Sequence, residues 1–232
     1  MDDYKVTPSE RATLTQGWRV AVLAVIAGYV DSYAFLSYNV YASFMSGNTT
    51  QTGLQVGQQK FGVAGIDLLP IPLFVGGVFI GTLVVHSSRG HRLSWLFASV
   101  GVLLAVAMAA IYPAPLPGWL GIVVLSLAMG IMNATATRVG GQSVSIGYVT
   151  GCLNNLAQHL AMAIKRVPVP NPQGSWDTHG SRAALLAGIW SAFLIGAALA
   201  AAATPRFASW TLLPPILILF AMAVSDWITA AG

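Results

Sequence analysis

The sequence predicts an all-α integral membrane protein with about six transmembrane helices, arranged as two pseudo-symmetric three-helix halves. The 232-residue chain is 56% hydrophobic and only 8% charged, whereas an ordinary soluble domain is about 25% charged. Uncharged runs of membrane-spanning length recur along the chain. These runs do not alternate apolar and polar residues, as the ~10-residue strands of a transmembrane β-barrel would. Together these observations predict a helical bundle in a lipid bilayer.

Eight segments are candidate membrane helices, because a helix needs ~20 residues to cross the hydrocarbon core. If all eight span, with the N-terminus inside, four of the eleven Lys and Arg residues lie outside. If 43–59 and 142–164 do not span, only Lys60 and Arg206 lie outside. The positive-inside rule therefore favours six spans with both termini in the cytoplasm. The eight segments are 17–40, 43–59, 66–86, 93–112, 119–138, 142–164, 182–203 and 207–228.

The six predicted spans divide into a cytoplasmic N-terminal segment, 1–16, a first membrane repeat, 17–116, and a second, 117–232. Each repeat opens with Gly-x-x-(Asp/Asn), ending at Asp31 in the first and at Asn133 in the second. Each then continues into a polar, Gly-rich segment and ends with two apolar helices. This order is typical of an inverted-topology repeat. A chance match between two Gly-rich apolar windows is the alternative.

Asp31 is the only carboxylate within an apolar run far from any segment end. Charged residues at membrane depth are costly and commonly functional. Asp31 is therefore a candidate to bind a proton, a monovalent cation or the amine of a substrate, and we expect it to be the most functionally sensitive residue. The alternative is a structural role, with Asp31 hydrogen-bonded to Asn48, Thr49 or Asn133. Asn133 has the same two interpretations, because an Asn at that depth often only bonds across helices.

The polar segments contain too many hydroxyl and amide side chains for lipid exposure. Such backbone is tolerated at membrane depth only inside the protein or beside water. We therefore expect a broken or re-entrant helix in each segment, with interruptions near 46–48 and 150–152, facing the interior. The candidate substrate or ion site shared by the two repeats consists of Asp31, Ser46, Gly47, Asn48, Thr49, Asn133, Thr150 and Gly151.

Two sequence blocks resemble a known family. The runs from Gly28 to Leu36 and from Phe44 to Thr49 are similar to the signature of the YoaK family, also called domain of unknown function 1275. The run around Gly130 and the run around Thr150 are similar to its second block. The resemblance covers nearly the whole chain. It implies a bacterial inner-membrane protein of about six spans and names no substrate.

The sequence contains none of the catalytic motifs sought. It has no phosphate-binding loop, nucleophile elbow or His-Glu-x-x-His motif, so we expect no enzyme, no metal site and no cofactor. The net charge of +4 comes from basic residues scattered among loops, so we expect no nucleic-acid partner.

The expected function is a small secondary transporter or channel for a small solute or ion. The alternative is a non-transporting membrane scaffold, or an assembly partner that binds a lipid or peptide. The expected surroundings are the bilayer of the bacterial inner membrane, crossed several times, with a homo-oligomer as a possible state.

Overall fold

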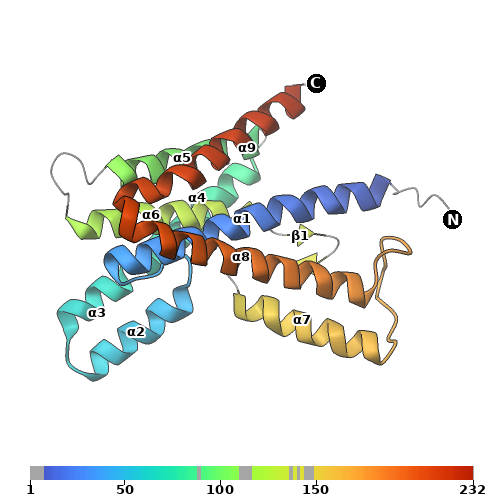
Figure 1. Cartoon of the computed structure of the whole chain (residues 1–232), viewed down its shortest axis with the longest axis horizontal. Coiled ribbons are helices and arrows are strands. Elements are labelled where there is room, and N and C mark those ends of the chain that lie inside the picture. The colour runs from blue at the N-terminus through green and yellow to red at the C-terminus, as the bar shows by residue number, and fades with distance from the viewer. Residues whose placement is uncertain are drawn as a thin grey trace.

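Long apolar runs, punctuated by polar and Pro-containing stretches, form a structure built mainly of helices. The computed structural model describes residues 8–87, 90–109, 117–135, 138–139, 142–143 and 149–231. Within them the all-α membrane class is confirmed, with one short antiparallel pair of two-residue strands, β1 (Arg138–Val139) and β2 (Gln142–Ser143). The helices in chain order are α1 (Pro8–Tyr38), α2 (Met45–Gly57), α3 (Phe61–Leu68), α4 (Pro70–Val85), α5 (Arg92–Ala109), α6 (Gly118–Asn133), α7 (Val149–Ile164), α8 (His179–Phe207), the 3-10 helix η1 (Ala208–Leu212) and α9 (Leu213–Ala231) (Figure 1).

Four described stretches are long and apolar enough to cross a membrane: Thr15–Tyr38, Phe61–Val85, Arg92–Ala109 and His179–Ala230. The last has 52 residues, and one straight helix of that length would measure about 78 Å. It folds back at η1 instead, because Ala208 adopts a left-handed φ of 47°, and α8 and α9 run in opposite directions (Figure 1). The apolar helix α6 is shorter, with 16 residues. The number six for the spanning helices stays a prediction.

The two polar segments form short helices that are not among these stretches. α2 has 13 residues and α7 has 16, which gives lengths of about 20 and 24 Å. The predicted interruptions at 46–48 and 150–152 are wrong by a few residues, because α2 begins at Met45 and α7 at Val149. In the first half the chain leaves the helical path earlier, at Asn39, which has a φ of 60°. Residues 144–148, before α7, lie outside the described residues.

Glycines allow α1 and α8 to cross closely. A Cβ added to Gly28 would lie 2.0 Å from the carbonyl oxygen of Phe193, and one added to Gly196 would lie 2.0 Å from that of Val25. No side chain fits at either position without moving backbone. Close backbone approach is the usual role of small residues in membrane helix packing. α1 therefore packs along a helix that comes much later in the chain.

The crossing of α4 and α6 is built in the same way. A Cβ added to Gly77 would lie 2.4 Å from the carbonyl oxygen of Leu127, and one added to Gly130 would lie 2.2 Å from that of Phe74. α5 in turn packs against α9. The packing is thus reciprocal. α1 of the first predicted repeat lies against α8 of the second, α6 of the second lies against α4 of the first, and α5 lies against α9.

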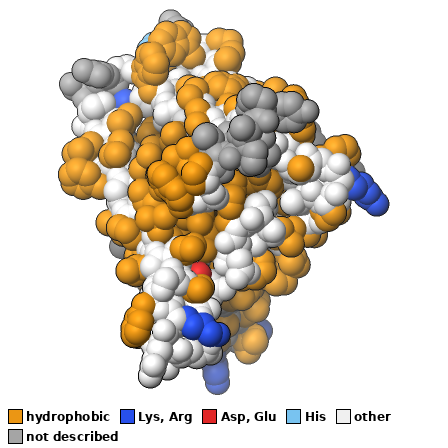
Figure 2. Space-filling view, turned by 90° about the vertical axis from the view of Figure 1, so that its left-hand side faces the viewer, with side chains coloured by type: hydrophobic (Ala, Val, Ile, Leu, Met, Phe, Trp, Pro, Cys, Tyr) orange, Lys and Arg blue, Asp and Glu red, His pale blue; other side chains and the backbone are white. Residues whose placement is uncertain are grey.

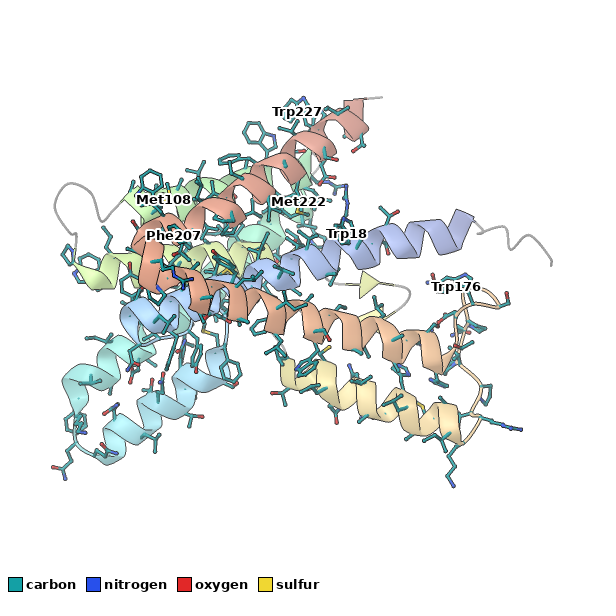
Figure 3. All side chains as sticks on the ribbon, in the orientation of Figure 1. Trp18, Met108, Trp176, Phe207, Met222 and Trp227 are labelled. Atoms are coloured by element: carbon teal, nitrogen blue, oxygen red, sulfur yellow. The ribbon has the colours of Figure 1, made fainter. Side chains whose placement is uncertain are left out.

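Lys60 and Arg206, the two basic residues predicted to lie outside the cell, are found at the same end of the molecule (Figure 1). The start of α1, the end of α9 and the α7–α8 connection lie at one end, with Trp18, Trp176 and Trp227, whereas the α2–α3 turn and η1 lie at the other (Figures 1 and 3). Lys60 lies in the α2–α3 turn and Arg206 just before η1. The predicted topology would make the first end cytoplasmic, and tryptophans at that end suit a membrane interface.

The outer surface is rich in large apolar side chains. Figure 2 shows hydrophobic side chains spread over one face of the molecule with few charges among them. Among the exposed ones are Phe79 on α4, Leu194 on α8 and Leu217 on α9, each more than half exposed. A soluble monomer rarely exposes so much contiguous apolar surface, whereas a lipid-facing surface does. The exposure therefore agrees with the membrane class.

Candidate functional site

Asp31 lies in the membrane-spanning part of α1 and is only 4% exposed. Both of its carboxylate oxygens accept hydrogen bonds from Ser43. The Ser43 backbone N–H donates to Oδ1 at 2.6 Å, and the Ser43 hydroxyl donates to Oδ2 at 2.6 Å. A buried carboxylate is costly unless donors offset its lost hydration. Ser43 supplies these donors from the linker, residues 39–44, that joins α1 to α2.

Asn48 holds the same linker at a second point. It is fully buried, and its Oδ1 accepts from the Tyr41 N–H at 2.9 Å while its Nδ2 donates to the Tyr41 carbonyl oxygen at 2.7 Å. The Tyr41 ring also stacks on Phe35 of α1 at a centroid distance of 4.9 Å. We call Asp31, Tyr41, Ser43 and Asn48 the linker clasp. Its hydrogen bonds fix the path of the linker and so the point at which α2 begins.

The structure therefore brings two of the predicted site residues, Asp31 and Asn48, to one linker. Ser46 and Thr49 lie beside them in sequence but are exposed. The Thr49 hydroxyl donates to the Met45 carbonyl oxygen within α2, at 2.8 Å. Asp31 is hydrogen-bonded to Ser43, which the sequence did not single out, in place of the Asn48, Thr49 or Asn133 expected by the structural interpretation. Ser43 follows Asp31 by 12 residues and lies outside any helix. The spacing rules of a helix therefore could not predict their contact.

The remaining predicted residues belong to other elements. Gly47 lies in the first turn of α2, where an added Cβ would lie 2.5 Å from the ring of Phe44. Asn133 is half-buried at the last residue of α6. Thr150 is exposed and Gly151 buried in the first turn of α7, a helix that packs on α8. The predicted site residues within 43–59 and 142–164 thus lie near the N-terminal ends of two short helices.

A polar cluster connects the ends of α7 and α8. His159 Nδ1 lies 2.8 Å from His179 Nδ1, and Arg182 Nε and Nη2 donate to Asp177 at 2.7 and 2.9 Å. The hydrogen bonds from Arg182 lower the pKa of the Asp177 carboxyl, against burial, which by itself raises it. Among the described residues, no group of three or more His, Cys, Asp and Glu could hold a metal ion. The His159–His179 contact joins α7 to α8, and the Asp177–Arg182 ion pair joins the α7–α8 connection to the first turn of α8.

A second polar cluster was not singled out from the sequence. Arg19 of α1 forms an ion pair with Asp226 of α9. Asp226 is 7% exposed and belongs to a cavity that also reaches His91, just before α5, and Arg92 and Ser94 of α5. The available signal was the pairing of opposite charges at the predicted cytoplasmic ends of the first and last spans. Three separate helices meet at this ion pair.

Comparisons with known proteins agree with the resemblance noted in the sequence. The sequence profile of the family described as "Protein of unknown function (DUF1275)" matches residues 20–225. The chain is 25% identical over 223 residues to the UPF0700 transmembrane protein YoaK of Bacillus subtilis (strain 168), covering 92% of this chain and 95% of that protein. It is 32% identical over 141 residues to the UPF0700 transmembrane protein RA0705 of Rhizobium meliloti (strain 1021), covering 61% and 60% of the two chains. No solved structure matches the chain. The chain therefore belongs to the DUF1275 family, whose relatives named here are transmembrane proteins.

Proposed function

We propose that this protein is a small secondary transporter or channel for a small solute or ion, with a polar midplane site shared by two inverted repeats. It would act as a multi-pass protein of the bacterial cytoplasmic membrane. The observation that carries the proposal is the placement of the two short polar helices. Both α2 and α7 begin near the middle of the molecule and run towards opposite ends (Figure 1). Discontinuous helices that begin at midplane form the substrate sites of many transporters.

The reciprocal packing supports the inverted repeat. α1 with α8, and α6 with α4, form two equivalent crossings with a pair of glycines at each. A pseudo-two-fold axis that exchanges the halves would exchange these crossings and also exchange α2 with α7. The repeated Gly-x-x-(Asp/Asn) pattern then has a physical explanation, because Gly28 and Gly130 are the positions at which corresponding helices lie against the backbone of their neighbours. In inverted-repeat transporters the substrate site lies at the interface of the repeats.

The first turns of α2 and α7 provide the chemistry of the proposed site. The helix dipole is positive at the N-terminal end of a helix. In α2 the N–H groups of Met45, Gly47 and Asn48 already donate to the carbonyl oxygens of Ser43 and Phe44, so the dipole and the nearby hydroxyls would attract a solute there. Ser46 and Thr49 on α2 and Thr150 on α7 add exposed hydroxyls there. We expect a solute that presents hydrogen-bond acceptors or negative charge to these turns. Asp31 acts as a positioning residue in this scheme, because its carboxylate holds the linker that leads into α2.

The same contact favours the second candidate, a non-transporting scaffold. Both oxygens of Asp31 are occupied by Ser43, and Asp31 is 4% exposed. A dry, fully bonded acid is what a scaffold requires, whereas a coupling acid needs access to water or to the ion. The two candidates therefore differ in whether anything crosses the membrane.

Reconstitution into liposomes tests the proposal. The probes are protons, driven by a potassium gradient with valinomycin, and urea, glycerol, formate and phosphate, whose entry is followed by the rate of liposome swelling. We expect the wild type to pass at least one probe faster than empty liposomes do. Thr49→Val with Thr150→Val should reduce that flux several-fold, because both exposed hydroxyls are lost while the side-chain shape is kept. Thr82→Val is the matched control, since Thr82 is exposed on α4 and makes the same bond to its own helix, at 2.7 Å to the Val78 carbonyl oxygen. Folded wild type that passes none of the probes would instead favour the scaffold.

A further inference from the structure

A polar cavity of ≈ 320 Å³ lies where α1, α5 and α9 meet. Its lining includes Asp226 and Thr229, which flank Trp227 at the end of the molecule predicted to be cytoplasmic (Figure 3). Trp227 stacks on His91 with ring centroids 4.0 Å apart, and Trp95 meets Trp227 edge-on at 5.9 Å. Aromatic residues of this kind gather at the level of lipid headgroups. The residues that line the cavity are Arg19, His91, Arg92, Leu93, Ser94, Asp226, Thr229 and Ala230.

The cavity contains buried polar atoms that have no partner among the described residues. Oδ1 of Asp226 pairs with Arg19, but Oδ2 has no such partner. The Ser94 hydroxyl and His91 Nδ1 also have no hydrogen-bond partner among the described residues. Asp226 and Ser94 are 7% and 4% exposed. Buried polar atoms are nearly always hydrogen-bonded in folded proteins. The free carboxylate oxygen calls for a donor, and a cationic N–H group suits it best.

An apolar groove of ≈ 530 Å³ begins beside this cavity. It runs between α4, α5 and α6, and its wall includes Ile80, Leu83 and Trp95, which are 46%, 59% and 58% exposed. The groove therefore opens onto the outer apolar surface of two candidate membrane spans. Groove and cavity are both lined by Arg92. An apolar surface with a polar site at one end suits a molecule with an apolar chain and a polar head.

Arg92 lies where the polar cavity and the apolar groove meet. Its Nη1 donates to the carbonyl oxygens of Val85 at 2.8 Å and Ser87 at 3.4 Å, which fixes the guanidinium at the end of α4. The Nε and Nη2 atoms of a guanidinium carry three further N–H groups. Guanidinium groups bind phosphate through such N–H pairs. Arg92 thus places a phosphate-binding group between an apolar groove and an unpaired carboxylate oxygen.

We propose that these two cavities form one binding site for a phospholipid with a primary ammonium headgroup, of the phosphatidylethanolamine class. The headgroup ammonium donates to Asp226 Oδ2 and to the Ser94 hydroxyl. The phosphate lies against Arg92, and an acyl chain follows the groove along Ile80 and Leu83. A choline headgroup has no N–H to donate, and a glycerol headgroup has no positive charge. The site therefore selects among lipids of the same acyl chain by the headgroup alone.

Native mass spectrometry of the purified full-length protein tests the selection. The probes are phosphatidylethanolamine, phosphatidylcholine and phosphatidylglycerol with identical acyl chains, and free phosphoethanolamine. We expect at least a fivefold preference for phosphatidylethanolamine over phosphatidylcholine. Equal binding of the two lipids would overturn the proposal. Binding of free phosphoethanolamine as tight as that of the whole lipid would overturn the role of the groove.

Variants locate the preference. Asp226→Asn keeps an oxygen for Arg19 but loses the charge that attracts the ammonium, so the preference should disappear. Ser94→Ala removes a single unpaired hydroxyl and should reduce the preference, and this variant carries the test if Asp226→Asn does not fold. Ser99→Ala is the matched control, because Ser99 lines only the groove and its hydroxyl bonds the Leu96 carbonyl oxygen at 2.8 Å. A preference unchanged in Ser94→Ala, or lost equally in Ser99→Ala, would contradict the assignment.

Discussion

Replacing Ser43 by Ala perturbs the linker clasp at one atom. The variant removes the hydroxyl that donates to Asp31 Oδ2 at 2.6 Å and leaves the backbone N–H that donates to Oδ1. A hydrogen bond to a charged group contributes about 1.5–3 kcal/mol. Because Asp31 is buried, no water replaces the lost donor without a structural change. We expect the free energy of unfolding to fall by about 2 kcal/mol.

A double-mutant cycle with Asp31→Asn separates this contact from its surroundings. Asn keeps the size of Asp but makes only neutral hydrogen bonds with Ser43, so Asp31→Asn alone should cost about 1–2 kcal/mol. The two single changes remove parts of one interaction. The double variant should therefore cost less than the sum of the singles, with a coupling of about 1–2 kcal/mol.

Unfolding in mixed micelles of dodecylmaltoside and SDS, followed by circular dichroism, measures these differences. Ser99→Ala is a suitable reference, because it removes a hydroxyl that bonds within its own helix, and it should change stability by less than about 0.5 kcal/mol. If Ser43→Ala lies within that range of the wild type, or if the cycle is additive, the clasp does not position α2. The proposed function would then need another role for Asp31.

Three further predictions follow from the packing, the charges and the topology. Gly28→Ala should prevent stable folding, because its Cβ would lie 2.0 Å from a carbonyl oxygen of α8, whereas Gly53→Ala, with nothing within 4 Å, should stabilise α2 by about 0.5–1 kcal/mol; thermal unfolding in detergent distinguishes them. Asp177 has a lowered pKa because of its bonds to Arg182, so its stabilising contribution is present above the ordinary pKa of about 3.9 and is lost as the pH falls through the lowered value. The stability gap between wild type and Asp177→Asn should therefore be constant above about pH 5 and close only in stronger acid, and unfolding at a series of pH values checks this. A cysteine placed at Gly90 should react with a membrane-impermeant maleimide only from the cytoplasmic side, and labelling from outside would reverse the topology.

Hydropathy predicted where the helices lie but not which helices touch. The predicted segment 93–112 is close to α5, and 119–138 is close to α6. A lipid-facing side chain and a helix-facing side chain are both apolar, so composition carries little information on partners. The exchange of partners between α1 and α8 depends on the precise fit at Gly28 and Gly196, which appears only in three dimensions.

The sequence predicted some residues of the candidate site but not the contacts that these residues make. The cost of burying a charge singled out Asp31, and the polar composition of 43–59 singled out Asn48. Their partners, Ser43 and the backbone of Tyr41, lie in an irregular linker whose path follows no periodicity. Arg19 and Asp226 carry opposite charges at the predicted cytoplasmic ends of the first and last spans, but hydropathy does not show that these two helices are neighbours, and the residues meet only because α1 and α9 converge.

The exchange of helices between the halves has a consequence for how the protein is made. α1 leaves the ribosome long before α8, the helix that it packs against. At ~5–20 residues per second, the residues between Gly28 and Gly196 take roughly ten to thirty seconds to synthesise. During that time α1 must reside in the bilayer with its glycine face unpaired, available to lipids or to membrane chaperones. The order of translation therefore delays the contacts of α1 with α8, and of α5 with α9, until the last third of the chain has entered the membrane.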